Sequence, residues 1–308
     1  MSKPLILGLI AIVLGASLGI AVEQSPVEAP LAKDTYPGLF SGALTSARLA
    51  TLPAGILLRS GNLKLTQKDL DLDIAKAPAT IRPQLKNNAF FALEDRATGD
   101  LLAAEARAWA QQNGGKVGAK RDELVRAYLN SFISTLTVAD EEIRMFYDEN
   151  KSMMGSATFD QAKEPLKDYL LDEKRRQAVS AHILTLSERT LVEVDKDWAA
   201  KQYVLAINNP VDKARKSGKP TMVDFGADKC RPCDMMTPIL SEIKKTYAGK
   251  VNVVFVHVGK EQVLGARFGI EAIPVQVFYD KAGKEVHRHV GFFAKDQILS
   301  KLAEMGVR

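Results

Sequence analysis

Short apolar runs alternate with helical patterns in the C-terminal third of the chain. Four runs have the length and composition of β-strands: residues 221–225, 251–256, 275–279 and 285–290. Helical patterns lie before, between and after them: residues 211–215, 235–247 and 295–305. Strands that alternate with helices are typical of layered α/β folds. We therefore predict an α/β domain over residues 205–308.

The region before this domain follows a helical period instead. Apolar side chains recur at steps of three and four over residues 90–108, and this spacing predicts a helix of several turns. Two capping boxes predict helix starts: Thr66 with Asp69, and Thr158 with Gln161. The remaining patterns predict helices over residues 121–135, 141–147 and 159–186, then a short strand-like run at 191–194. We predict an all-α domain over residues 56–200.

The first 55 residues have a different texture. An uncharged, apolar run extends from Leu5 to Val22 behind a single Lys. It fits a secretory signal peptide, and it is also long enough to remain as a membrane anchor, which needs about 20 residues and can manage with about 17. Residues 23–55 are rich in Pro, Ala, Ser and Thr without a sustained period, which predicts a linker. Either interpretation of residues 1–22 places the rest of the chain in the periplasm or another extracytoplasmic space.

Length and composition agree with two soluble domains. A chain of 308 residues is longer than one average core fills. Hydrophobic content of 46% and charged content of 26% are ordinary for globular proteins. The net charge of +5 comes without a basic stripe interleaved with aromatic residues, so we expect no nucleic-acid partner.

The two cysteines of the chain, Cys230 and Cys233, follow the first predicted strand of the α/β domain. Two thiols separated by two residues at the start of a helix are arranged as dithiol redox chemistry requires. The helix N-terminus favours the thiolate of Cys230, so we predict that Cys230 is the nucleophile. Cys233, one turn further on, suits a resolving role.

Two other interpretations of the pair are weaker. Structural zinc takes four ligands, and beyond the two cysteines the chain offers only histidines without zinc-site spacing: His182, His257, His287 and His289. A purely structural disulfide would close a loop of a few residues and remove little entropy from the unfolded chain. We expect no metal and no other cofactor.

The C-terminal domain resembles thioredoxin. The resemblance lies in Val223-Asp224-Phe225-Gly226-Ala227 before Cys230, in Pro238, in Phe268-Gly269-Ile270-Glu271-Ala272-Ile273-Pro274, and in Gly283 with Gly291. It implies a thioredoxin fold with a cis peptide bond before Pro274, which would place the backbone of Ile273 against the sulfur atoms for pairing with an extended substrate. Asp224 would be buried behind Cys233 and could take its proton as a general base, although an ordinary strand-end carboxylate is the alternative.

The residues around the cysteines depart from the usual thioredoxin pattern. Thioredoxin usually has Trp before the first cysteine and Gly-Pro between the two, whereas this chain has Lys229 and Arg231-Pro232. Two cations beside Cys230 would favour its thiolate, so we place Lys229 and Arg231 with Ile273 among the substrate-binding candidates. The absent Trp removes a flat apolar contact for substrates.

The helical domain resembles the chaperone domain of exported SurA-type and PrsA-type peptidyl-prolyl isomerases. The resemblance rests on Leu58-Arg59-Ser60-Gly61-Asn62, Leu65 to Leu70, Leu101 to Ala106, Val138 to Ile143, Tyr147 to Lys151 and Lys174-Arg175-Arg176. The isomerase domain of that family would follow Lys151, but Phe159 comes too soon for an insert. The resemblance implies a substrate-holding or dimerising module without isomerase activity, and a plain helical spacer is the alternative.

These observations predict an exported thiol-disulfide oxidoreductase that acts on protein disulfides. Its expected partners are unfolded or disulfide-bearing exported proteins and a membrane electron-relay protein, with a possible homodimer through the helical domain. The alternative is a periplasmic chaperone or assembly factor with an accessory thioredoxin domain. The direction of electron flow stays open between reductase, oxidase and isomerase.

Overall fold

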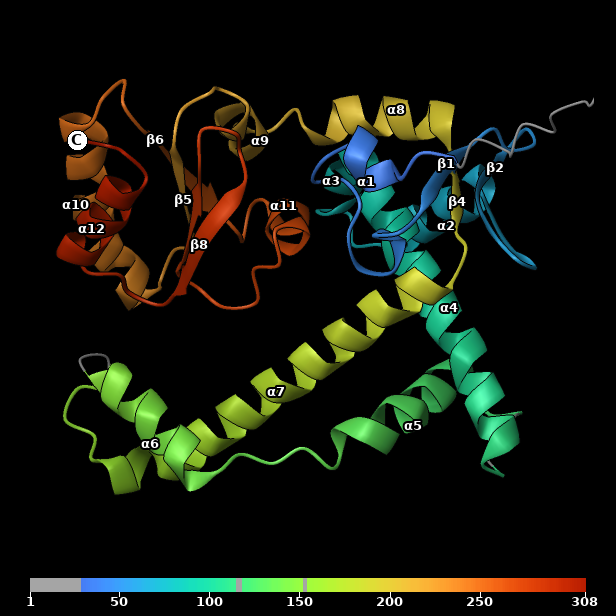
Figure 1. Cartoon of the computed structure of the whole chain (residues 1–308), viewed down its shortest axis with the longest axis horizontal. Coiled ribbons are helices and arrows are strands. Elements are labelled where there is room, and N and C mark those ends of the chain that lie inside the picture. Colours follow the sequence, from blue (N-terminus) through green and yellow to red (C-terminus); the bar gives the residue numbers. More distant parts are fainter. Residues whose placement is uncertain (1–28, 115–117, 152–153) are drawn as a thin grey trace, which may run out of the picture.

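The computed structural model of the chain describes residues 29–114, 118–151 and 154–308. Figure 1 shows two units and a long helical arm that leaves the first unit and passes along the second. The N-terminal unit extends from α1 through α8, and the C-terminal unit extends from α9 through α12. Their cores are separate, because the clusters of buried apolar side chains in one unit contain no residue of the other.

The N-terminal unit is largely helical and also contains a sheet. Its helices are α1 (Ala32–Thr35), the 3₁₀ helix η1 (Gly42–Leu44), α2 (Gln67–Lys76), α3 (Arg82–Asn87), α4 (Ala89–Gln112), α5 (Arg121–Ile133), α6 (Asp140–Glu149), α7 (Phe159–Arg189) and α8 (Lys196–Ala206). Its strands are β1 (Arg48–Ala50), β2 (Ile56–Ser60), β3 (Leu63–Thr66) and β4 (Glu193–Asp195), in the order β1-β4-β2-β3. The expectation of an all-α domain is therefore wrong, because chain segments more than 120 residues apart pair as strands.

Both predicted capping boxes are present. The Thr66 hydroxyl accepts a hydrogen bond from the backbone N–H of Asp69 at the start of α2, and Thr158 does the same for Gln161 at the start of α7. Each satisfies a donor that the first turn of a helix leaves without an intrahelical partner. Pro165 lies inside α7.

The linker predicted over residues 23–55 is wrong for residues 29–55, which belong to the folded unit. This segment contains α1, η1 and β1, and Leu39, Phe40 and Leu44 are buried in the N-terminal core. The rings of Phe40 and Phe90 lie 4.3 Å apart between centroids. Burial of scattered apolar side chains orders this segment although its sequence has no period. Residues 23–28 and the predicted signal peptide or anchor lie outside the described residues.

The C-terminal unit has the predicted α/β layers. Its helices are α9 (Pro210–Arg215), α10 (Arg231–Thr246), α11 (Gln262–Arg267) and α12 (Lys295–Glu304). Its strands are β5 (Thr221–Gly226), β6 (Asn252–His257), β7 (Val275–Tyr279) and β8 (Glu285–Val290), in the order β6-β5-β7-β8. β5 pairs in parallel with β6 and antiparallel with β7, so β5 is a central strand, buried along its whole length.

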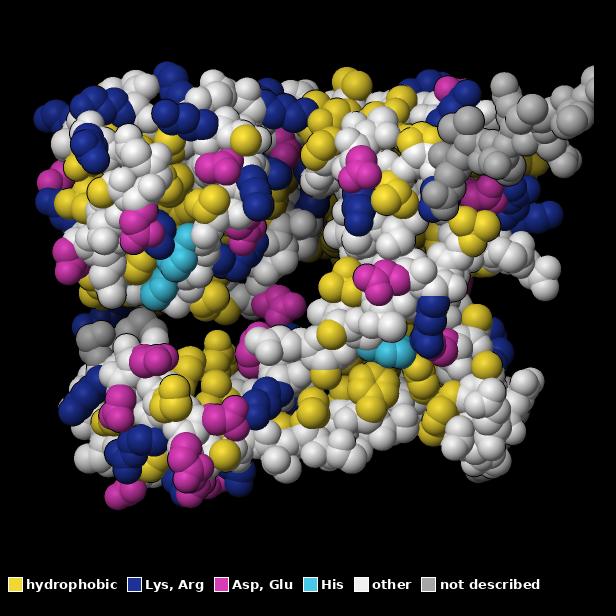
Figure 2. Space-filling model, in the orientation of Figure 1, with side chains coloured by type: hydrophobic (Ala, Val, Ile, Leu, Met, Phe, Trp, Pro, Cys, Tyr) yellow, Lys and Arg dark blue, Asp and Glu magenta, His cyan; other side chains and the backbone are white. Residues whose placement is uncertain are grey.

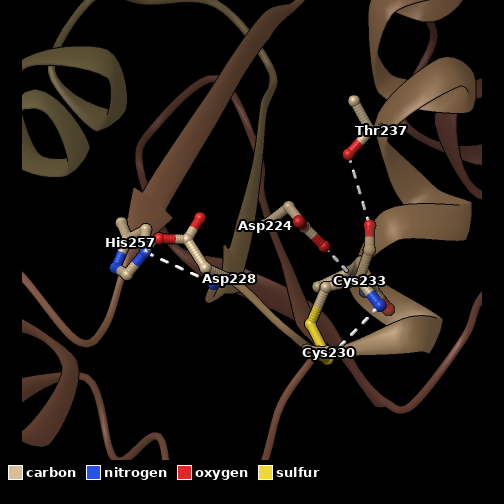
Figure 3. Close-up of a disulfide and its surroundings, with 7 residues drawn as sticks. Asp224, Asp228, Cys230, Cys233, Thr237 and His257 are labelled. Atoms are coloured by element: carbon tan, nitrogen blue, oxygen red, sulfur yellow. Dashed lines mark hydrogen bonds and ion pairs between the residues drawn. A yellow bond between two sulfur atoms is a disulfide. The ribbon is translucent and has the colours of Figure 1, made fainter.

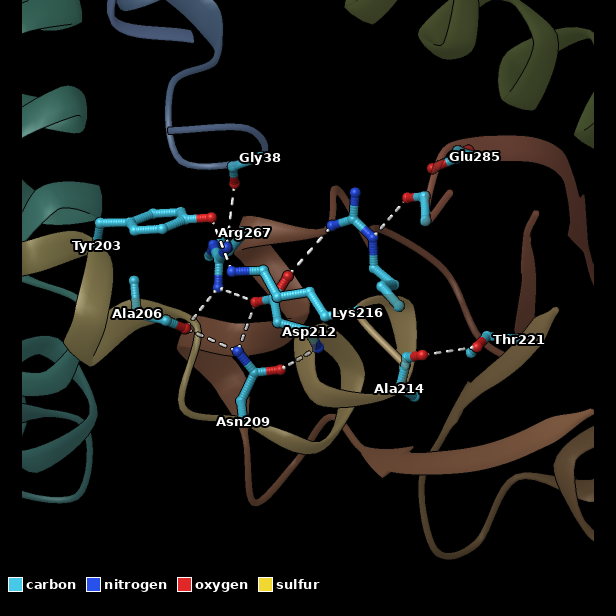
Figure 4. Close-up of polar contacts among 12 residues, drawn as sticks. Gly38, Tyr203, Ala206, Asn209, Asp212, Ala214, Lys216, Thr221, Arg267 and Glu285 are labelled. Atoms are coloured by element: carbon cyan, nitrogen blue, oxygen red, sulfur yellow. Dashed lines mark hydrogen bonds and ion pairs between the residues drawn. The ribbon is translucent and has the colours of Figure 1, made fainter. Parts of the chain in front are cut away.

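Arg267, which is paired with the buried Asp212 inside the C-terminal unit, connects the two units by hydrogen bonds (Figure 4). The guanidinium of Arg267 in α11 donates hydrogen bonds to Asp212 at 2.8 Å, to the carbonyl of Ala206 at 2.8 Å and to the carbonyl of Gly38 at 3.0 Å. Asp212 is 3% exposed and also accepts a hydrogen bond from Arg215. Because buried charges require such partners, this cluster holds the C-terminal unit against α8 and the segment before η1.

The arm formed by α5, α6 and α7 is more loosely joined to the C-terminal unit. A gap separates the α6–α7 end of the arm from that unit in the space-filling view (Figure 2). Arg176 of α7 forms an ion pair of 2.7 Å with Glu271, in the loop before β7. Within the described ranges, no helix is long and apolar enough to cross a membrane.

Candidate active site

The two cysteines form a disulfide at the N-terminus of α10 (Figure 3). Cys230 is the N-cap residue, and its Sγ accepts a hydrogen bond of 3.3 Å from the backbone N–H of Cys233. Pro232 lies in the first turn, where a missing N–H costs no intrahelical bond. Cys230 is partly exposed and Cys233 is buried. An external thiol or disulfide can therefore reach Cys230 more readily than Cys233.

The turn before Cys230 has an unusual backbone. Lys229 has a φ of 60°, in the left-handed region that residues other than glycine rarely adopt. Asp228, one position earlier, contacts the Nε2 atom of His257 at the end of β6, with the carboxylate oxygen 3.0 Å away. The side chains of Lys229 and Arg231 are exposed on either side of Cys230. The two cations therefore flank the first cysteine along the chain, on the exposed surface.

Asp224 lies on β5 and is 1% exposed. Its Oδ1 accepts a hydrogen bond of 2.8 Å from Nε2 of Gln276 on β7, and its Oδ2 has no partner among the described residues. Burial raises the pKa of Asp224 to about 6, against the opposing effect of the Gln276 hydrogen bond. Figure 3 shows the Asp224 carboxyl group on the Cys233 side of the sheet. This is the environment that a proton acceptor for a buried thiol requires.

Gly226, at the end of β5, leaves space for the resolving cysteine. A Cβ atom at this position would lie 3.4 Å from Sγ of Cys233 and 3.1 Å from Cε2 of Phe255. The buried sulfur and an aromatic ring therefore both pack against the backbone where a side chain would otherwise stand.

Pro274 lies at the same end of the sheet. The peptide bond between Ile273 and Pro274 is cis, as predicted. Val275, the next residue, pairs with Phe225 on β5, so the proline adjoins the strand end that leads to the dithiol. The backbone groups of Ile273 have no hydrogen-bond partner within the described part of the chain. This backbone edge is therefore open to an extended peptide.

The structure brings the predicted residues to one end of the sheet and adds others that sequence reasoning missed. Gln276, Phe255, Asp228 and His257 contact the site or its turn from neighbouring elements. One signal was available: Gln276 is a polar residue inside the apolar run 275–279, like Asp224 within 221–225. No local pattern indicated the other three.

A dithiol at a helix N-terminus, a buried carboxyl group on the central strand and a cis-proline at the adjacent strand define a protein of the thioredoxin fold with a redox site. The family model "Thioredoxin" matches residues 204–304. The thioredoxin of Alicyclobacillus acidocaldarius is 36% identical over 93 residues, which make up 30% of this chain and 88% of that protein. The chain belongs to the thioredoxin family through its C-terminal unit, and this implies a thiol-disulfide redox role.

Two longer relatives are matched over a smaller share of their length. The thioredoxin-like protein HCF164, chloroplastic, of rice is 29% identical over 160 residues, or 51% of this chain and 60% of that protein. The thiol:disulfide interchange protein TxlA homolog of Synechocystis is 36% identical over 84 residues, or 27% of this chain and 47% of that protein. The chain thus spans about half of the length of these two relatives.

Proposed function

We propose that this protein is an exported thiol-disulfide oxidoreductase that acts on the disulfides of other exported proteins. The observation that carries the proposal is the disulfide between a partly exposed Cys230 and a buried Cys233, beside the buried Asp224. The thiol:disulfide interchange relative supports the same class of reaction.

The first step starts from the reduced dithiol. The Cys230 thiolate attacks one sulfur of the client disulfide, the client S–S bond breaks, and its other sulfur leaves as a thiolate that takes a proton from water. A mixed disulfide between Cys230 and the client forms. Lys229 and Arg231 favour the attacking thiolate, and the open backbone of Ile273 pairs with the client segment.

The second step releases the client. Cys233 transfers its proton to the Asp224 carboxylate, and the resulting thiolate attacks the sulfur of Cys230. The mixed disulfide breaks, the second client sulfur leaves as a thiolate and is protonated, and the Cys230–Cys233 disulfide forms. Two electrons have then passed to the client. Another turnover requires a partner dithiol, and we assign that role to a membrane electron-relay protein.

We place the protein in an extracytoplasmic space because residues 5–22 form an apolar run. This run would be either a cleaved signal peptide or a retained membrane anchor. The N-terminal unit and its arm would hold unfolded clients beside the dithiol or join two copies of the chain, in the manner of the SurA-type domain that its sequence resembles. Exposed apolar side chains on the arm favour such a role: Met145 (62% exposed), Tyr169 (40%) and Leu184 (45%).

Reduction of insulin by dithiothreitol in the presence of catalytic amounts of the protein tests the enzymatic proposal. We expect Cys230→Ser to abolish catalysis, because the only other thiol of the chain, Cys233, is buried. Reduced Cys233→Ser, freed of dithiothreitol and then mixed with insulin, should instead accumulate a mixed disulfide, visible by mass spectrometry. Retained turnover in Cys230→Ser would contradict the proposal.

The chaperone alternative is separated by a double variant. If Cys230→Ser/Cys233→Ser suppresses client aggregation as well as the wild type and complements a deletion, the thioredoxin unit is accessory. The direction of electron flow follows from the reduction potential of the pair, since a value near about −270 mV indicates a reductase and one near about −120 mV an oxidase.

A further inference from the structure

Phe255 is the neighbour of Asp224 on the adjacent strand of the sheet. It lies on β6, the edge strand of the C-terminal sheet, in register with Asp224 on β5. Gln276 is the register partner of Asp224 on the other side. Paired residues of neighbouring strands project from the same face of a sheet, so Asp224 stands between an amide group and an aromatic ring.

The ring also reaches the resolving cysteine. The position that a Cβ of Gly226 would take lies 3.1 Å from the Phe255 ring and 3.4 Å from Sγ of Cys233. Because Gly226 has no side chain, the Phe255 ring and the Cys233 sulfur can both approach the end of β5, the strand that also carries Asp224. Phe255 is 53% exposed, whereas Asp224 is 1% exposed. Phe255 is thus about half covered by its neighbours, and its ring is near the position that a Cβ of Gly226 would take.

We propose that Phe255 is a positioning residue of the redox site. Its ring closes the edge side of the sheet over Asp224 and Cys233, keeps water from the carboxyl group, and so sets the pH range in which Asp224 accepts the Cys233 proton. This inference deepens the oxidoreductase proposal and rests on it. The ring touches no reacting bond, and the proton and electron transfers are those of the second step above.

Phe255 would act on Asp224 by excluding water from it. The pKa of Asp224 is raised by desolvation, and the one opposing contribution is the hydrogen bond from Gln276. Cys233 on the facing helix α10 titrates only after the disulfide is reduced, and no charged side chain of the described residues contributes to the raised pKa of Asp224. Water admitted at the edge would stabilise the carboxylate and lower the pKa.

The test is a carbon-13 NMR titration of the Asp224 carboxyl group in the full-length oxidised protein. We expect Phe255→Ala to lower its pKa by about one unit. Phe255→Leu, which keeps an apolar cover, should stay near the wild type. The matched control is Val286→Ala on β8, a similarly exposed apolar residue (47%) at the opposite edge, and it should not move the titration.

An Asp224 titration in Phe255→Ala that coincides with the wild type would overturn the role of Phe255, as would an equal shift in Val286→Ala. If Phe255→Ala does not fold, Phe255→Gln, which retains bulk but brings a polar group, is expected to lower the pKa instead. The titration uses no substrate. Insulin turnover by Cys230→Ser would therefore contradict the oxidoreductase proposal and leave the Phe255 result standing, whereas an unshifted titration contradicts only the role of Phe255.

Discussion

Two buried carboxyl groups, one in each unit, have pKa values far above their ordinary ones. Burial raises the pKa of Asp224 in the C-terminal unit to about 6 and that of Glu94, on α4 of the N-terminal unit, to about 7. Glu94 is 8% exposed. By pKa alone, Glu94 would be the better candidate for a proton acceptor near neutral pH.

The surroundings of the two groups are different. Both oxygens of Glu94 accept hydrogen bonds from Ser41, whose backbone N–H and hydroxyl anchor the segment that leads into η1. Asp224 keeps its Oδ2 without a partner among the described residues, and its carboxyl group lies on the Cys233 side of the sheet (Figure 3). A raised pKa thus reports burial in both groups, and what distinguishes Asp224 is an unpartnered oxygen in a carboxyl group on the dithiol side of the sheet, as the proposed proton acceptor requires.

Replacement of Asp224 has the largest expected effect on catalysis. Asp224→Asn should slow resolution of the mixed disulfide by about 10²-fold at pH 7, because the proton acceptor for Cys233 is lost. The wild-type rate should rise with pH through about 6 as Asp224 ionises, and the variant should lack this inflection. Stopped-flow release of the second thionitrobenzoate from Ellman's reagent measures the step. Glu94→Gln is the control and should stay within about twofold of the wild type, since its site contacts no sulfur.

The same substitution should stabilise the oxidised protein at high pH. The folded pKa of Asp224 lies above its ordinary value of 3.8, so the contribution to stability is full below about pH 4 and is lost as pH rises to about 6. The loss amounts to about 3 kcal/mol. In urea unfolding, Asp224→Asn should match the wild type at pH 4 and exceed it at pH 8. Parallel pH profiles for the two proteins would show that Asp224 is not desolvated.

Glu94→Gln should also stabilise the folded protein at high pH, but the effect should develop over a higher pH range than for Asp224→Asn. Its folded pKa of about 7 exceeds the ordinary 4.5, so stability declines between about pH 4.5 and 7, by roughly 3 kcal/mol. The variant should be more stable than the wild type at pH 8 and nearly equal to it at pH 4, with redox activity unchanged. A loss of insulin reduction in this variant would remove the functional distinction between the two carboxyl groups.

The smallest expected effect is at the contact between the arm and the loop before the cis-proline. Arg176 and Glu271 are both largely exposed, at 43% and 64% for their side chains. Arg176→Ala should therefore alter unfolding free energy by less than about 1 kcal/mol. Lys174→Ala, which removes an ion pair with Glu142 within the arm, is a matched control. An insulin-reduction rate that changes in Arg176→Ala alone would assign the arm a part in substrate access.

Local sequence patterns predicted much of the C-terminal unit and its site. Sequence patterns predicted the strand over 221–225, the dithiol at the start of a helix and the cis-proline. Each of these depends on neighbouring residues or on a family motif of fixed spacing. The capping boxes at Thr66 and Thr158 were readable for the same reason. The assignment of residues 5–22 and the SurA-type role of the arm stay predictions.

Long-range contacts account for what was missed. β1 and β2 are short, and they form strands because β4, far along the chain, pairs with both. Helices α8 and α11 were not predicted, and each packs into a junction whose partners come from elsewhere: Arg267 of α11 reaches Gly38. A pattern within a window of a few residues cannot register pairing between distant segments.

The dithiol shows the same division between sequence and tertiary structure. The sequence by itself determined that Cys230 and Cys233 would lie at a helix N-terminus, because the strand, the turn and the helix are adjacent in the chain. Only the tertiary structure decided what surrounds them, since Asp224, Phe255 and Gln276 come together through strand pairing. Exclusion of water depends on all of these elements at once, and the proton affinity of Asp224 depends on that exclusion.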